Sequence, residues 1–135
     1  MKKIILVVED LEKEQAQAKE AVLEGGYKVI LASALADAKR LIESVKIDGI
    51  ISDLHFPESD RDNDRNRPCG LAVVTIAIQR NIPIVICSDL DHHFAHYLLD
   101  IISFLESVSA FKRIPTIIDL KDWNRAVNEL KKLIK

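Results

Sequence analysis

Three carboxylates follow two apolar runs of the sequence, and their positions give the first indication of chemistry. Glu9 and Asp10 come directly after the run IILVV at residues 4–8, and Asp53 comes directly after the run GIIS. Short Val/Ile/Leu runs are typical of buried parallel strands, and ligands of open α/β sheets bind beyond the carboxyl ends of such strands. If the two strands are neighbours, the three acids meet at one edge of the sheet.

Converging carboxylates repel one another unless a cation joins them, and ligands that are all oxygen favour a hard ion such as Mg²⁺. Beside such an ion a carboxylate is able to accept a phosphoryl group, because the ion neutralises the transferring oxygens. The acidic positions therefore predict a magnesium site that takes part in phosphoryl transfer. For Glu9 and Asp10, the alternative is an ordinary polar strand end followed by a helix cap.

Apolar runs and helical patterns alternate along the 135 residues, which fits a single domain. The runs predict strands at residues 3–8, 27–31, 48–53, 84–87 and within 111–118. Helical spacing predicts helices at residues 11–24, 33–45, 71–80, about 91–108 and after 119, with Ser33 and Asp119 as N-caps. Strands that are separated by helices predict an α/β fold, in which helices cover both faces of a parallel sheet.

Composition excludes several classes of function. With 19 basic and 21 acidic residues the net charge is −2, so no basic field attracts nucleic acid or an anionic membrane. The apolar run after Lys3 is shorter than the ~7 residues of a signal peptide, and no stretch is long enough to span a bilayer. Cys69 and Cys87 lack metal-binding spacing, which predicts free thiols and a cytoplasmic protein.

Residues 58–67 read ESDRDNDRNR and contain no apolar side chain. A segment of this composition has nothing to bury, so we expect a charged, mobile insert in the domain. It follows Asp53 closely and is therefore expected to lie over the acidic cluster.

Five stretches of sequence resemble one family when they are taken in order. They are KKIILVVEDLEKE, GGYKVILASALADAKRLI, DGIISDLHFPE, GLAVV and IPIVICSD. Together they are similar to the receiver domain of two-component response regulators, and the resemblance covers nearly all of residues 1–135. It implies a stand-alone receiver domain with a flavodoxin-like, doubly wound sheet of five parallel strands in the order 2-1-3-4-5.

The resemblance also implies a role for each site residue. Asp53 would be the phosphoacceptor, and Glu9 and Asp10 would hold Mg²⁺ together with Asp53. His55 would offer its backbone carbonyl to the metal, and the Ser88 hydroxyl would donate to a phosphoryl oxygen. A serine after a strand is also common in ordinary turns, which is the alternative for Ser88.

The implied activity is Mg²⁺-dependent self-phosphorylation and self-dephosphorylation on aspartate, and not the turnover of a conventional enzyme. The donor would be a sensor histidine kinase or a phosphotransfer protein. Phosphorylation would shift the conformation and change the binding of a downstream protein through the fourth helix, fifth strand and last helix. The sequence leaves the oligomeric state open, a homodimer included.

The sequence departs from the family at the lysine that normally ends the fifth strand. Two ways of aligning this region place Thr116 there, and Arg113 stands where the family has an aromatic residue. Lys112 and Lys121 are nearby, and Lys121 is the candidate because it lies at the active edge of the sheet. The departure supports an alternative function, a pseudo-receiver that binds partners without switching by phosphorylation.

Two other patterns in the sequence resemble metal sites. His92 and His96 are helical neighbours, and a solvated helix start is the favoured interpretation. Asp60, Asp62 and Asp64 have the opening spacing of a calcium loop, but the glycine and glutamate that such a loop needs are missing.

Overall fold

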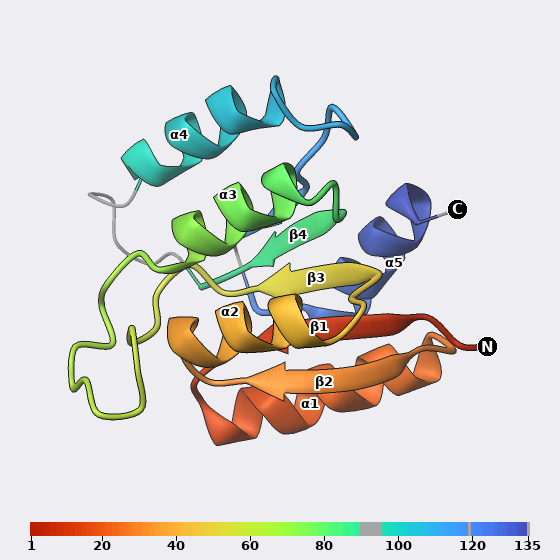
Figure 1. The fold of residues 1–135 in the computed structure, drawn as a ribbon, viewed down its shortest axis with the longest axis horizontal. Helices are drawn as coiled ribbons and strands as arrows, with labels where there is room; N and C mark the ends of the chain where they lie inside the picture. The colour runs from red at the N-terminus through yellow and green to blue at the C-terminus, as the bar shows by residue number, and fades with distance from the viewer. Residues whose placement is uncertain (90–95, 119, 135) are drawn as a thin grey trace.

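Five parallel strands form the centre of the structure, a computed structural model that describes residues 1–89, 96–118 and 120–134 (Figure 1). The strands are β1 Ile4–Val8, β2 Lys28–Ala32, β3 Gly49–Ser52, β4 Ile84–Cys87 and β5 Thr116–Ile117. Their order in the sheet is β2-β1-β3-β4-β5, which confirms the predicted topology. Because β1 lies directly beside β3, the acids that follow these two strands come to the same edge.

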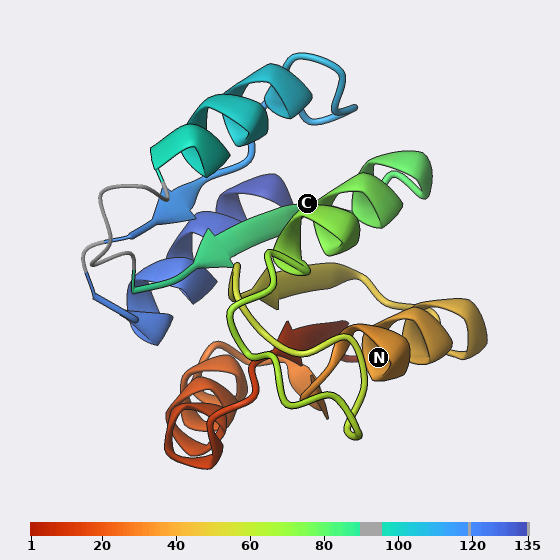
Figure 2. The same cartoon turned by 90° about the vertical axis from the view of Figure 1, so that its left-hand side faces the viewer.

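The helices cover both faces of the sheet, as Figures 1 and 2 show. Within the described residues they are α1 Glu12–Glu24, α2 Leu35–Ser44, α3 Gly70–Gln79, α4 His96–Glu106 and α5 Trp123–Leu133. Helices α1 and α5 enclose one apolar core with the sheet, and α2, α3 and α4 enclose the other. Strands β3 and β4 are buried along their whole length, which explains why their sequences are continuous apolar runs.

Helix α2 begins differently from the prediction that Ser33 is its N-cap. The helix starts at Leu35, and no side chain caps it. The backbone N–H groups of Leu35 and Ala36 instead donate to the carbonyls of Pro57 and Glu58, at 3.1 and 2.8 Å. The Ser33 prediction is wrong because the segment after β3 already satisfies these donors, an arrangement that only the tertiary fold creates.

The last helix also begins later than predicted. Helix α5 starts at Trp123, and the carboxylate of Asp122 accepts a hydrogen bond from the Arg125 N–H at 3.1 Å. The cap is therefore Asp122 and not Asp119, which lies outside the described residues. Lys121 consequently lies in the connection before α5 and not in its first turn.

The large apolar side chains of α4 divide between two environments. Leu98 and Ile102 are buried, whereas Tyr97 and Ile101 are 57% and 39% exposed. Consecutive helical residues point about 100° apart, so only one residue of each pair faces the core. The predicted start of this helix near Asp91 lies outside the described residues.

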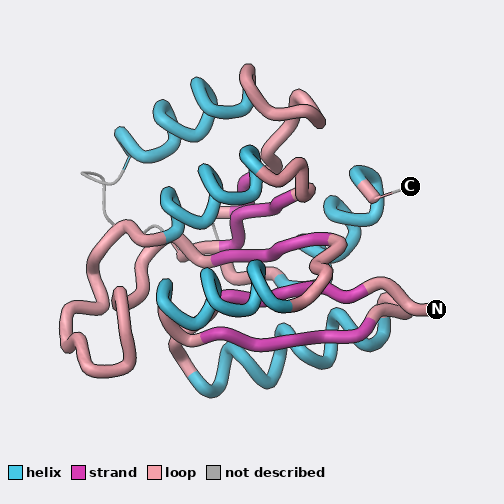
Figure 3. Tube along the Cα trace, viewed as in Figure 1, coloured by secondary structure: helices cyan, strands magenta, loops and turns pink. Residues whose placement is uncertain are grey.

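A long connection joins β3 to α3 and projects from the carboxyl edge of the sheet (Figure 3). Phe56 is fully buried and forms an isolated bridge with Pro68, so the two ends of the connection meet on the body of the protein. A Cβ atom on Gly70 would lie 2.4 Å from the Asp53 carbonyl oxygen. Glycine at this position lets α3 begin directly against the segment that carries Asp53.

The structure also bears on the predictions about the two cysteines and about membrane-spanning segments. Cys69 and Cys87 are free, as predicted, and the structure shows that both are buried. Among the described residues, no helix has both the length and the apolar character needed to cross a membrane.

Candidate functional site

The three acids predicted to converge do so at the ends of β1 and β3. The Asp53 N–H donates to the Val8 carbonyl and the Glu9 N–H donates to the Ala32 carbonyl, both at 2.9 Å, so the sheet ladder sets both positions. Carboxylate oxygens of Glu9, Asp10 and Asp53 lie within 4.8 Å of one another. The oxygen-only donor set and its concentrated negative charge fit a hard divalent cation such as Mg²⁺.

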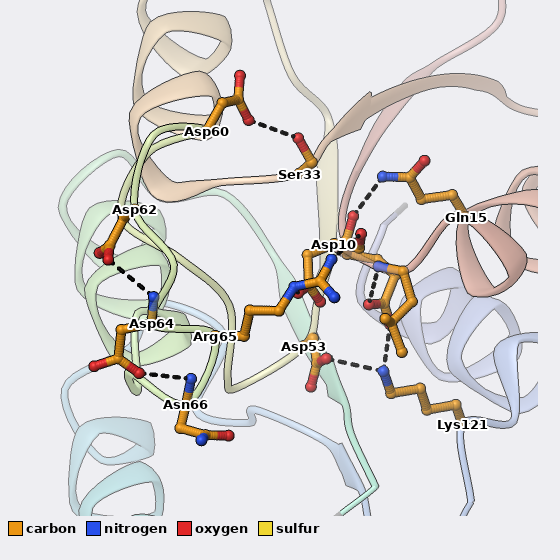
Figure 4. Close-up of polar contacts among 12 residues, drawn as sticks. Asp10, Gln15, Ser33, Asp53, Asp60, Asp62, Asp64, Arg65, Asn66 and Lys121 are labelled. Carbon is orange, nitrogen blue, oxygen red and sulfur yellow. Dashed lines mark hydrogen bonds and ion pairs between the residues drawn. The ribbon is translucent and has the colours of Figure 1, made fainter.

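Asp53 is 4% exposed, and both of its carboxylate oxygens accept hydrogen bonds. One oxygen accepts from the Leu54 N–H and from the Ser88 hydroxyl, each at 2.7 Å. The other accepts from Lys121 Nζ at 3.0 Å (Figure 4). These donors fix the orientation of a buried carboxylate and stabilise its negative charge.

Lys121 joins two of the acids through one ammonium group. Its Nζ lies 2.6 Å from Glu9 Oε1 and 3.0 Å from Asp53 Oδ2. Burial opposes the charge of Lys121, but the carboxylates of Asp53 and Glu9 outweigh it and raise the pKa of the lysine above its ordinary value. The ammonium group is therefore held charged between the two acids.

Lys112 and Thr116, the other two candidates for the lysine position of the family, do not contact Asp53. Lys112 is exposed, and its ammonium group donates to the Ser107 carbonyl at 3.4 Å. Thr116 lies in β5 and is also exposed. Alignment to the strand end indicates Thr116, whereas the ammonium group that contacts Asp53 comes from Lys121, in the connection before α5.

Glu9 is fully buried, although a lysine contacts it. Burial, followed by the negative charge of Asp53, raises the pKa of Glu9 to about 7. Lys121 and the Leu11 N–H, which donates at 3.0 Å, stabilise the charged form but do not restore the ordinary value. The charged form of Glu9 is therefore disfavoured in this cluster, and a further cation beside it would stabilise that form.

The second protein cation at the site is Arg65, which the sequence did not single out. Its Nε lies 2.9 Å from Asp10 Oδ2, and its terminal nitrogen donates to the Asp10 carbonyl at 3.4 Å (Figure 4). The only sequence signal was the position of a charged insert after Asp53. No periodicity identifies which of its arginines returns to the site.

An open cavity of about 560 Å³ lies at this edge of the sheet. Asp10, Asp53, Ser88 and Lys121 line it together with Arg65. His55 also lines the cavity, and the role of its carbonyl as a metal ligand stays a prediction.

The structure describes one of the two alternative metal patterns, the acids of the insert. Asp60 accepts from the Ser33 hydroxyl, while Asp62 and Asp64 accept backbone N–H groups within the insert (Figure 4). His92, His93 and the side chain of His96 lie outside the described parts of the structure. The mobility of the insert stays a prediction.

The raised pKa of Glu9 predicts how stability depends on pH in metal-free buffer. Between about pH 4.5 and 7 the folded protein holds a proton on Glu9 that the unfolded chain releases, so the free energy of unfolding should fall as pH rises. Chemical denaturation across this range measures the slope. Glu9→Gln should remove this part of the fall, whereas the exposed Glu20→Gln should leave it unchanged. Equal slopes for wild type and Glu9→Gln would contradict the interpretation.

Comparisons with known proteins complete the description of the site. No protein-family model matches the sequence, and no curated protein matches it significantly. Solved structures match over nearly the whole chain. The receiver domain of a Francisella response regulator is 22% identical with a TM-score of 0.69. The alignment spans 98% of this chain and 96% of that one.

Two further structures have the same architecture. The response regulator TrrA from Thermotoga maritima, solved in complex with Mg²⁺ and BeF, is 22% identical with a TM-score of 0.69, and 97% of this chain covers 98% of that one. The receiver domain of a histidine kinase from Syntrophus aciditrophicus is 23% identical with a TM-score of 0.70, at coverages of 98% and 89%. This chain therefore has the fold of response-regulator receiver domains.

Proposed function

We propose that this protein is a receiver that accepts a phosphoryl group on Asp53 from a histidine kinase or a phosphotransfer protein, with Mg²⁺ as cofactor. One observation carries the proposal. The Asp53 carboxylate is held by Ser88 and Lys121 beside two further acids whose oxygens lie within 4.8 Å. The Mg²⁺ and BeF bound to TrrA, which has the same fold, give the proposal independent support.

Each residue of the site has a task in this proposal. Glu9, Asp10 and Asp53 would hold Mg²⁺ together with the His55 carbonyl. The bound metal would neutralise the oxygens of the incoming phosphoryl group. An Asp53 oxygen would attack phosphorus, so that an O–P bond forms as the P–N bond of the donor phosphohistidine breaks. The Ser88 hydroxyl, now 2.7 Å from Asp53, would then donate to a phosphoryl oxygen.

Lys121 would balance the charge that phosphorylation adds. The phosphoryl group brings further negative charge to a cluster that already holds three acids. Lys121 contacts Asp53 before the reaction. Movement of its ammonium group toward the phosphoryl group would therefore change the conformation of the connection before α5. This is the conformational signal that we propose, a shift between two populated states.

The face formed by α4, β5 and α5 is the proposed surface for a downstream protein. Tyr97, Ile101 and Phe104 on α4 are exposed, followed by Val108 just beyond the helix. Positions spaced by three and four residues share one side of a helix. Large apolar side chains gathered in this way suit contact with another protein better than contact with nucleic acid, and the net charge of −2 agrees.

One observation favours the alternative, a pseudo-receiver that does not switch by phosphorylation. Asp10 forms an ion pair with Arg65, so one of the acids expected to bind the metal is already neutralised by a cation of the protein. Both functions require the same fold, and labelling of Asp53 separates them.

Acetyl phosphate should phosphorylate Asp53 only when Mg²⁺ is present, because otherwise the donor must approach uncompensated carboxylates. Intact mass spectrometry should find an increase of one phosphoryl group in wild type and none in Asp53→Asn. Asp60→Asn, an acid of the insert outside the cluster, is the matched control and should label normally. Equal labelling of wild type and Asp53→Asn would show that the acceptor lies elsewhere, and no labelling of folded wild type would favour the pseudo-receiver.

Lys121→Ala should slow phosphoryl acceptance about tenfold or more, because a buried cation that stabilises the transferring group is lost. Lys112→Ala removes the same charge from an exposed site and should leave the rate within about twofold. Time courses of labelling at saturating Mg²⁺ measure both rates. If the two variants react at the wild-type rate, the site works without Lys121 and its proposed role is wrong.

A further inference from the structure

The charged insert contacts the acidic cluster through one side chain, Arg65. Its other polar contacts either stay within the insert or join it to Ser33, to Ala36 and to the two ends of the connection. Arg67 pairs with Glu58 at 2.5 Å and with Asp62 at 3.5 Å. Arg65 extends to Asp10, where it contacts both the carboxylate and the backbone carbonyl (Figure 4).

Arg65 and a divalent metal would compete for the same acid. Arginine stays protonated under all ordinary conditions, so it cannot relieve the repulsion by losing a proton. The carboxylate that Arg65 contacts belongs to the cluster expected to hold the metal. Two cations at this carboxylate would repel each other in a partly buried site.

The burial of the two partners indicates which of them moves. The Asp10 side chain is 8% exposed, whereas the Arg65 side chain is 59% exposed and is carried by an insert on the surface. Arg65 is able to swing into solvent, but Asp10 is held between the end of β1 and the start of α1. Displacement of Arg65 therefore disturbs little of the packed core.

We propose that Arg65 is a built-in competitor of the metal, which sets the metal affinity of the site and leaves Asp10 when a divalent cation binds. This inference rests on the proposed function, because it assumes that Asp10 is a metal ligand. It adds that metal binding and the position of residues 58–67 are linked. Because the two are linked, a contact that holds the insert on the site weakens metal binding, and bound metal weakens the hold on the insert by the same factor.

Isothermal titration with MgCl₂ at constant ionic strength tests the proposal on the whole chain. Arg65→Gln should bind Mg²⁺ roughly twofold to fivefold more tightly than wild type, the range expected for loss of an exposed ion pair. Arg61→Gln removes the same charge from the same insert and is the matched control for the general electrostatic field. It should bind as wild type does.

The sign of the change separates competition from support. If Arg65 instead orders Asp10 for the metal, Arg65→Gln would bind more weakly, and the proposal would be overturned. Equal changes in Arg65→Gln and Arg61→Gln would also overturn it, since they would reflect net charge alone. If wild type binds Mg²⁺ and Arg65→Gln binds equally well, only this inference fails. If neither wild type nor Arg65→Gln binds, the proposed metal site fails with it.

Limited proteolysis gives a second readout that does not depend on affinity. Saturating Mg²⁺ should speed tryptic cleavage of wild type after Arg61, because the insert is released from Asp10. Cleavage of Arg65→Gln at the same position should be fast with and without the metal. Slower cleavage of wild type in Mg²⁺, with an unrelated substrate cut at a constant rate, would contradict displacement of the insert.

Discussion

Mutual repulsion of three carboxylates is the constraint on which the rest of this site depends. Parallel pairing of β1 with β3 brings Glu9, Asp10 and Asp53 together, and backbone hydrogen bonds to neighbouring strands hold Glu9 and Asp53 in place. The surrounding structure compensates with donors to Asp53 and a lysine shared with Glu9. The compensation is incomplete, since burial and the charge of Asp53 still raise the pKa of Glu9 to about 7.

The two cations that offset this repulsion come from the two least regular parts of the site. Lys121 lies in the connection before α5, and Arg65 lies in the insert between β3 and α3. Connections of this kind move more easily than strands. A change of charge at Asp53 or Asp10 therefore acts directly on segments that are able to change conformation. Under the proposed function, charge compensation and signalling would be two consequences of the same arrangement.

The sheet and its acids could be predicted from the sequence because they depend on local pattern. Buried parallel strands are continuous apolar runs, and the residue after each run must lie at the edge of the sheet. Loop conformation has no comparable pattern. The capping of α2 by Pro57 and Glu58, the pairing of Arg65 with Asp10, and the cap of α5 at Asp122 all depend on where connections turn. Lys121 was identified only because it lies near the active edge, and not from its place in an alignment.

The central claim is that Glu9, Asp10, Asp53 and Lys121 form one site for a phosphoryl group and a divalent metal. Fluorine NMR of the protein with beryllofluoride tests it most directly, since this complex imitates a phosphoryl group bound to a carboxylate. We predict bound fluoride resonances in wild type only when both beryllofluoride and Mg²⁺ are present, and none in Asp53→Asn. Folded wild type without bound resonances at millimolar Mg²⁺, or identical resonances in Asp53→Asn, would contradict the account.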